Sequence, residues 1–163
     1  MTQHRYDEVL VALRRIIRAT DLHSKQLSKI SGLTSPQLLI LQNLQTYEEL
    51  TVGEIARNVS LSQATVTTII DRLEKREFVK RQRGSEDKRK VYVHLTDAAL
   101  EALLNAPKPL QSSFVQQFQD LKDWEQTMIL SSLERVAHMM DAQHIDASPV
   151  LDLGQLDRLG PID

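Results

Sequence analysis

Apolar residues recur every three to four positions through much of the chain, which is the spacing of one buried face of an α-helix. The first such stretch covers about residues 6–30, and Gly32 is expected to end it. A second helix is expected to follow, with Thr34 or Ser35 as its N-cap and Pro36 at an early helical position. The chain is therefore predicted to open with two helices.

A short helix is predicted next, over residues 52–58. Thr51 precedes it as a favourable N-cap, and Glu54, three residues later, can complete a capping box. The turn that follows is expected to place Asn58 in the left-handed conformation, which asparagine tolerates better than most residues.

The following helix, of about residues 62–76, has two chemically different faces, and Ser62 is expected to cap it. Its apolar face has helical spacing and carries Val66, Ile69, Ile70 and Leu73. Its opposite face is polar and then basic, and carries Gln63, Thr65, Thr67, Thr68, Arg72 and Lys75. Two helices joined by a tight turn, the second with such a free polar face, fit the major groove of DNA, where outward side chains reach base edges.

The pattern then changes to a period of two, which is typical of β-strands. Val79–Arg83 and Val91–Leu95 are predicted strands, and the polar residues 84–90 between them are predicted to form a hairpin tip. A hairpin placed directly after a helix-turn-helix is a wing. Thr96 and Asp97 are expected to begin another helix, which extends to about residue 106.

Two prolines are expected to interrupt the C-terminal helices. Pro107 and Pro109 break the helical pattern because proline lacks the amide hydrogen and clashes with the preceding turn. Helical spacing resumes over residues 110–121 and again over residues 123–140. Residues 144–163 contain prolines, glycines and scattered aspartates, and are predicted to be an irregular tail.

Charge is distributed unevenly along the chain. The net charge is −2, but residues 72–90 contain nine basic and four acidic side chains, so this segment carries +5 and the remainder −7. Such segregation indicates contact with a polyanion such as double-stranded DNA, although a solvated charged surface is the alternative on charge alone. The basic residues expected to contact DNA from the wing are Arg83, Lys88, Arg89 and Lys90.

Several classes of protein are excluded or disfavoured. The absence of cysteine excludes a disulfide framework, a thiolate zinc site and a thiol redox sensor. The five histidines form no ligand pair, and no nucleophile elbow, phosphate loop or paired-carboxylate motif is present, so we expect no metal, no cofactor and no enzyme activity. No apolar run approaches the roughly 20 residues that span a membrane, and no signal-peptide core is present, so a cytoplasmic protein is expected.

Three stretches resemble the MarR family of bacterial transcription regulators. They are LTSPQL at 33–38, the helix-turn-helix with VGEIA at 52–56 and LSQATVTTIIDRL at 61–73, and the wing with VKR at 79–81, DKR at 87–89 and VYVHLT at 91–96. The resemblance covers about residues 8–142 and implies a mainly α fold with a small β-wing. It implies a single domain of residues 1–143, with a winged helix-turn-helix lobe over 34–96 and a helical dimerisation lobe made of 6–30 and 98–142.

The resemblance also implies roles for particular residues. The family's wing aspartate and arginine pair with each other, and the arginine enters the minor groove; the matching positions are Asp87 and Arg89. The family is dimeric, and the residues that match the dimer stripes are Leu10, Leu13, Ile17, Phe114, Phe118, Leu133, Val136 and Met140.

The family binds small-molecule effectors, often aromatic acids, between its two lobes. Arg18 and His23 are the first residues to test for that role, and the alternative is that both are exposed or structural. The aromatic content of 4% gives little support for an aromatic-lined pocket.

The sequence departs from the family pattern in two places. Glu77 stands where the family often has glycine, and a left-handed conformation there would cost about 1 kcal/mol. Pro107 and Pro109 interrupt a helix that the family tends to continue. A narrower resemblance, over residues 13–25, is to a subgroup that includes regulators of compatible-solute genes such as those for ectoine.

The predicted function is that of a homodimeric, sequence-specific DNA-binding transcription regulator. It is expected to repress from a palindromic operator and to be released by a small molecule or a solution condition. One alternative is a protein–protein interaction module on the same fold, which would not need the basic segment. Another is a DNA binder without an effector, which responds only to ionic strength.

Overall fold

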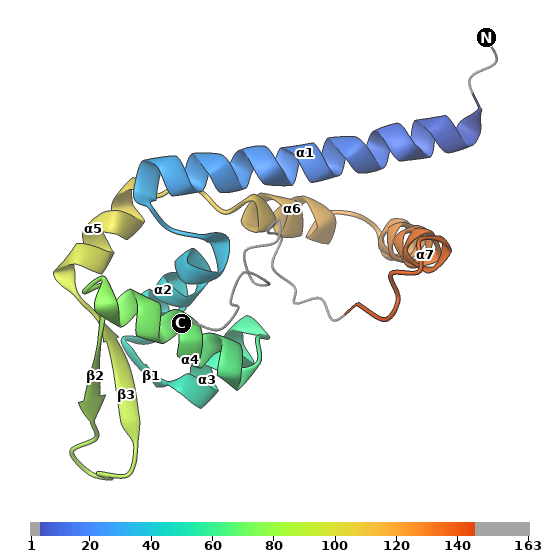
Figure 1. Ribbon diagram of the computed structural model, residues 1–163. Helices are drawn as coiled ribbons and strands as arrows, with labels where there is room; N and C mark the ends of the chain where they lie inside the picture. The colour runs from blue at the N-terminus through green and yellow to red at the C-terminus, as the bar shows by residue number, and fades with distance from the viewer. Residues whose placement is uncertain (1–3, 146–163) are drawn as a thin grey trace. The chain divides into compact units, whose positions relative to one another are not determined.

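A computed structural model describes residues 4–145 and gives two compact units, residues 4–107 and residues 108–145. The first unit contains five helices and three strands (Figure 1). In chain order they are α1 (Arg5–Ser31), α2 (Ser35–Tyr47), β1 (Glu49–Thr51), α3 (Val52–Val59), α4 (Gln63–Lys75), β2 (Val79–Arg83), β3 (Val91–Leu95) and α5 (Asp97–Asn105). None of the helices within residues 4–145 combines the length and the apolar character that crossing a membrane requires.

Helix α1 ends where the sequence predicts. Gly32 adopts φ 67°, in the left-handed region, and its amide donates to the carbonyl of Ser28 at 2.9 Å. Of the 27 residues in α1, only Thr20 and Leu27 are buried, so most of its apolar side chains face solvent in the single chain.

Helix α3 begins with the predicted capping box. The Glu54 amide donates to the Thr51 hydroxyl at 3.3 Å, and the Thr51 amide and hydroxyl both donate to the Glu54 carboxylate at 2.8 Å. Hydrogen bonds from the Thr51 backbone and then from its side chain lower the pKa of Glu54 below its usual value. The capping box therefore depends on an ionised carboxylate.

Replacing Thr51 with alanine is expected to lower the free energy of unfolding by about 1 kcal/mol at neutral pH. The pKa of Glu54 is lower in the folded state than its value of about 4.5 in the unfolded chain. The ionised carboxylate therefore stabilises the fold fully above about pH 4.5, and this stabilisation is lost as the pH falls through the folded-state pKa. Urea denaturation at about pH 7 and below about pH 4 tests this. The difference in the free energy of unfolding between wild type and Thr51→Ala should be smaller in acid than at neutral pH. The same difference at both pH values would argue against a role for the Glu54 carboxylate.

The turn between α3 and α4 differs from the prediction in one residue. Asn58 stays helical, and Ser60 takes the left-handed conformation with φ 55°. Helix α3 continues to Val59 because that side chain is buried in the core, so the chain reverses one residue later. The Leu61 amide then donates to the carbonyl of Ala56 at 3.1 Å and closes the turn.

The sheet contains a strand that the sequence pattern does not reveal. Strand β3 is central and pairs antiparallel with both β2 and β1, so the spatial order is β1-β3-β2. Strand β1 has three residues, of which only Leu50 is buried, opposite Val93. Too few residues alternate there to give a period of two.

The end of α4 contains the strained residue that the sequence predicts. Glu77 has φ 60°, where the MarR pattern often has glycine. Its carbonyl accepts a hydrogen bond of 2.6 Å from the hydroxyl of Thr96, the residue that also caps α5. This bond helps to hold the left-handed turn that directs the chain from α4 into the wing.

The core of the first unit lies where α2, α3, α4 and the sheet meet. Helix α4 contributes its predicted apolar face, and all four of its side chains are buried: Val66, Ile69, Ile70 and Leu73. The opposite face of α4 is thereby fixed toward solvent.

The second unit consists of α6 (Leu110–Gln119) and α7 (Asp123–Met139). Helix α5 ends at Asn105 and α6 begins after Pro109, so the predicted proline break is confirmed. The side-chain amide of Gln126 donates to the carbonyls of Phe118 and Leu121 at 3.1 and 3.0 Å and joins the two helices. No residue of either helix is buried in the single chain. The predicted tail lies outside the described residues from residue 146 onward.

Candidate nucleic-acid interface

Helix α4 presents a polar surface that begins at its capped N-terminus. The Ser62 hydroxyl accepts a hydrogen bond from the Thr65 amide at 3.1 Å and lies 2.7 Å from the Thr65 hydroxyl. Gln63 and Thr67 are exposed, and Thr65, Thr68 and Arg72 are partly exposed. The residues predicted to reach base edges are thus brought together on one solvent-facing side of α4. We call this side, with Gln63, Thr65, Thr67, Thr68 and Arg72, the reading face.

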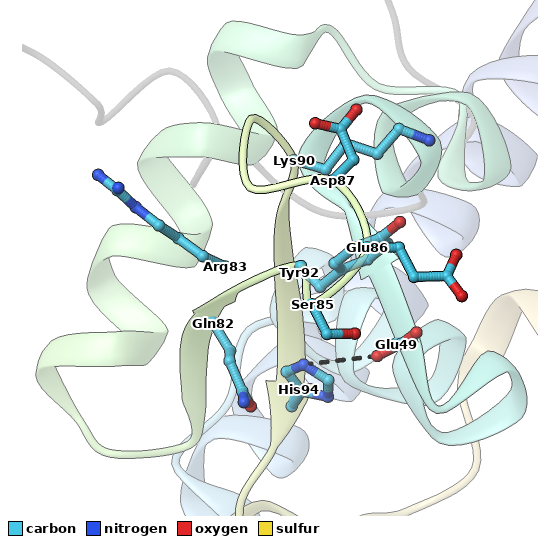
Figure 2. A pocket seen from close by; sticks show the side chains of 10 residues that line it. Glu49, Gln82, Arg83, Ser85, Glu86, Asp87, Lys90, Tyr92 and His94 are labelled. Atoms are coloured by element: carbon cyan, nitrogen blue, oxygen red, sulfur yellow. Dashed lines mark ion pairs between the residues drawn. The ribbon is translucent and has the colours of Figure 1, made fainter.

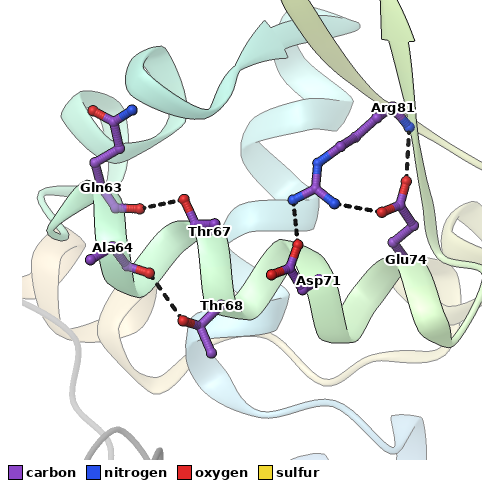
Figure 3. A network of polar contacts seen from close by, with 7 residues as sticks. All are labelled: Gln63, Ala64, Thr67, Thr68, Asp71, Glu74 and Arg81. Atoms are coloured by element: carbon purple, nitrogen blue, oxygen red, sulfur yellow. Dashed lines mark hydrogen bonds and ion pairs between the residues drawn. The ribbon is translucent and has the colours of Figure 1, made fainter.

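Two threonines of this face, Thr67 and Thr68, have their hydroxyl hydrogens already engaged. Thr67 donates to the carbonyl of Gln63 at 2.9 Å, and Thr68 donates to the carbonyl of Ala64 at 3.1 Å (Figure 3). With that bond in place, each side chain can offer a base an acceptor oxygen or a methyl group, but not a donor.

Strand β2 is fastened to α4 by an arginine that the sequence analysis did not single out. Arg81 lies 2.6 Å from Asp71 and 2.5 Å from Glu74 through its two terminal nitrogens, as Figure 3 shows. Partial burial acts to lower the pKa of Arg81, but the hydrogen bonds that its guanidinium donates to Asp71 and Glu74 outweigh this effect, so the pKa is raised overall. The guanidinium therefore stays charged and offsets two carboxylates on α4.

The wing loop contains the predicted ion pair. Arg89 Nε lies 3.2 Å from Asp87 Oδ1, and the Arg89 amide donates to the same oxygen at 3.0 Å. These two hydrogen bonds, the backbone one first, lower the pKa of Asp87 below its usual value. The Arg89 side chain is 93% exposed, and among the described residues only its Nε has a partner. Its terminal nitrogens are therefore available to a ligand.

The wing loop folds back over its own sheet and leaves a polar hollow of about 430 Å³ (Figure 2). Carboxylates and cations both line the hollow, and His94 lies 3.7 Å from Glu49 across the β1–β3 pair. The Gly84 amide donates to the carbonyl of Lys90 at 2.9 Å. A Cβ at Gly84 would lie 2.7 Å from the carbonyl oxygen of Asp87, so this return of the chain requires glycine.

Comparison with known proteins identifies the family of this fold. The sequence model of the MarR family matches residues 33–91, from two residues before α2 to the first residue of β3. An uncharacterised helix-turn-helix transcriptional regulator of Bacillus cereus is 34% identical over 128 residues, which are 76% of this chain and 84% of that protein. The chain belongs to the MarR family.

Solved MarR-like structures share the fold. A MepR-like protein complexed with pseudoligands superposes with a TM-score of 0.56 at 24% identity and covers 86% of this chain and 97% of its own. The PcaV regulator of Streptomyces coelicolor, solved with its natural ligand, superposes with a TM-score of 0.55 at 23% identity. The match covers 78% of this chain and 89% of the PcaV chain.

Three predictions are confirmed by these findings. They are the MarR family, the mainly α fold with a small winged sheet, and a transcription regulator instead of an enzyme. The narrower resemblance to compatible-solute regulators stays a prediction.

The remaining basic residues predicted to contact DNA in this MarR-family chain lie on α4, on β2 and in the wing loop. Lys75, Arg83, Lys88 and Lys90 are exposed, and Arg83 and Lys90 also line the polar hollow of Figure 2. Flexible exposed cations of this kind suit contacts with phosphates, which position a protein on DNA without reading its sequence.

The two residues predicted for the MarR effector site are not brought together. Arg18 lies 2.9 Å from Asp21 and lines a shallow hollow of about 380 Å³ on α1, with Arg14, Arg15 and Leu22. His23 is not among the residues that line this hollow. Within residues 4–145 there is also no group of three or more side chains suited to hold a metal ion.

Proposed function

We propose that the chain is a homodimeric repressor that blocks a promoter by binding an imperfect palindrome. The two recognition helices enter successive major grooves about 34 Å apart. The observation that carries this proposal is the pairing of a solvent-facing polar side on α4 with a wing arginine whose terminal nitrogens are unoccupied. A DNA-bound repressor of bacterial genes works in the cytoplasm.

The proposed dimer explains why so many apolar residues are exposed in the single chain. Leu10 and Ile17 of α1 are 44% and 53% exposed, and Phe114 and Met140 of the second unit are 49% and 61% exposed. Exposed apolar surface on this scale marks an interface. We propose that the partner copy covers it, which joins both units in one MarR-like domain of residues 1–143. The residues proposed for the interface are Leu10, Leu13, Ile17, Phe114, Phe118, Leu133, Val136 and Met140.

The proposed DNA contacts divide into two kinds. Gln63, Thr65, Thr67 and Thr68 face base edges in the major groove, and Arg89 enters the adjacent minor groove. The residues proposed to contact phosphates or to anchor the helix N-terminus are Ser62, Arg72, Lys75, Arg83, Lys88 and Lys90.

Release from DNA is proposed to follow binding of a small molecule or a change in solution conditions. Either would alter the spacing of the two winged helix-turn-helix lobes in the dimer. The PcaV regulator was solved with its natural ligand, and Arg18 is the residue of this chain that we would test first for such a site. Titrating DNA release with organic acids at fixed salt separates an effector-gated repressor from one that responds to ionic strength alone.

Selection of duplexes from a randomised library, followed by footprinting, tests the proposed function. We expect an inverted repeat, and an affinity that falls about 10³-fold or more between about 50 and 200 mM salt. Selection of no duplex at all would favour the protein–protein interaction module. Binding that is insensitive to salt would contradict the phosphate contacts of the wing.

Substitutions on the reading face are expected to change which sequence is preferred. Because the Thr68 hydroxyl hydrogen is engaged, Thr68→Val should keep a contact made by the methyl group, whereas Thr68→Ser should lose it. Gln63→Ala should remove a bidentate contact to adenine. Each loss should lower discrimination at one base pair about fivefold. Binding to single-base operator variants measures this discrimination, and an unchanged base preference in both Thr68→Ser and Gln63→Ala would show that the reading face is misassigned.

A further inference from the structure

Arg76 connects the end of the recognition helix to the end of α1. It follows α4 directly, and its Nη1 donates to the carbonyl of Gly32 at 2.8 Å, a contact between residues 44 positions apart. The same nitrogen lies 3.5 Å from the side-chain oxygen of Gln37, which belongs to the capping box of α2. The guanidinium also lies over the ring of Phe78, at 4.7 Å from its centroid.

This contact lies at the C-terminal end of α1. Gly32 forms the left-handed C-cap of α1, and a Cβ there would come within 3.2 Å of Arg76 Nη2, so the two groups fit closely. Near the C-terminal end of α1, Leu27 is fully buried. From Leu27 toward the N-terminus of α1, most of the apolar side chains are exposed. A small rotation at the elbow between α1 and α2 would therefore displace the far end of α1 by a large distance.

We propose that Arg76 is a positioning residue that sets the direction of α1 relative to the recognition helix. It thereby sets the spacing between the two recognition helices of the dimer. This inference rests on the proposed function, because α1 carries part of the surface that we assign to the partner copy. The guanidinium is already engaged by Gly32, Gln37 and Phe78, which separates its role from that of a phosphate contact.

The first test measures how strictly the protein requires one spacing of half-sites. The probe is the duplex selected by the wild-type chain, with one or two base pairs inserted or deleted at its centre. Arg76→Gln is expected to lower the discrimination between correct and altered spacing about fivefold. The neighbouring Lys75→Gln removes a proposed phosphate contact, so as the matched control it should weaken binding to all spacings equally and leave this ratio unchanged. Arg76→Lys keeps the charge but not the planar guanidinium, so it should show a discrimination between spacings that lies between those of Arg76→Gln and wild type.

Two outcomes of that test would overturn the inference. If Arg76→Gln weakens all spacings equally and lowers the salt slope by about one, Arg76 is a phosphate contact. If it lowers only the melting temperature and leaves the spacing ratio unchanged, its role is structural.

A second test needs no DNA, so it decides the inference even if no duplex is selected. The chain has no cysteine, so Glu8→Cys with Ala64→Cys introduces spin labels only at two exposed sites, on α1 and α4. Labelled chains diluted into unlabelled chains report the distance within one chain. We expect a narrow distance distribution with Arg76 and a broader, displaced one with Arg76→Gln. Identical distributions would overturn the inference.

Discussion

Replacing Arg89 with alanine is expected to lower affinity for the selected operator about 30- to 100-fold, the scale of one specific arginine contact. The Arg89 side chain is 93% exposed, and Asp87 holds it through Nε and through the backbone amide. The side chain is thus oriented before DNA binds, so little of its contact energy is offset by ordering. Fluorescence anisotropy with the selected duplex measures the effect.

The controls for this prediction separate a specific contact from general loss of charge. Lys88→Ala removes a neighbouring exposed cation and should weaken binding only about threefold, roughly equally for all sequences. Size-exclusion chromatography should show the Arg89→Ala dimer intact, because the wing is remote in sequence from the proposed interface residues. An Arg89→Ala affinity within twofold of wild type would remove the wing from the proposed mechanism.

Replacing Arg81 with alanine is expected to reduce operator affinity about 10- to 30-fold, although Arg81 itself is not proposed to touch DNA. Its loss would leave the carboxylates of Asp71 and Glu74 uncompensated on α4, the helix proposed to enter the groove, where they would repel phosphates. It would also free β2 from α4, and we expect the free energy of unfolding to fall by about 1–2 kcal/mol.

A compensating variant distinguishes these two effects of Arg81. Adding Asp71→Asn and Glu74→Gln to Arg81→Ala removes the repulsion but does not restore the link between β2 and α4. Most of the lost affinity should therefore return, and the lost stability should not. If the triple variant binds no better than Arg81→Ala, the electrostatic explanation is wrong and Arg81 acts only by holding the wing in place.

Features with a local cause could be predicted from the sequence. The capping box of Thr51 and Glu54 and the C-cap at Gly32 each depend on residues within a few positions, so short patterns reveal them. The break at Pro107 and Pro109 follows from the chemistry of proline itself. The wing pair was predicted by family resemblance, since spacing alone does not select Asp87 as the partner of Arg89.

Features with a tertiary cause could not be predicted. The sequence pattern favours Asn58 for the left-handed turn, but burial of Val59 moves that turn to Ser60. The contacts of Arg81 with α4 and of Arg76 with Gly32 join residues from 7 to 44 positions apart, and nothing in the local pattern marks either arginine as different from its basic neighbours. Strand β1 is similarly defined by its partner β3 and not by its own three residues.

The absence of any buried residue in α6 and α7 has a consequence for how much protein the cell must hold. In the proposed dimer these two helices are stabilised only when a second copy covers their apolar faces, so folding and assembly become one equilibrium. The melting temperature is then expected to rise with protein concentration. Newly made chains at concentrations too low to dimerise would be exposed to proteolysis, so the proposed repression would need a minimum rate of synthesis.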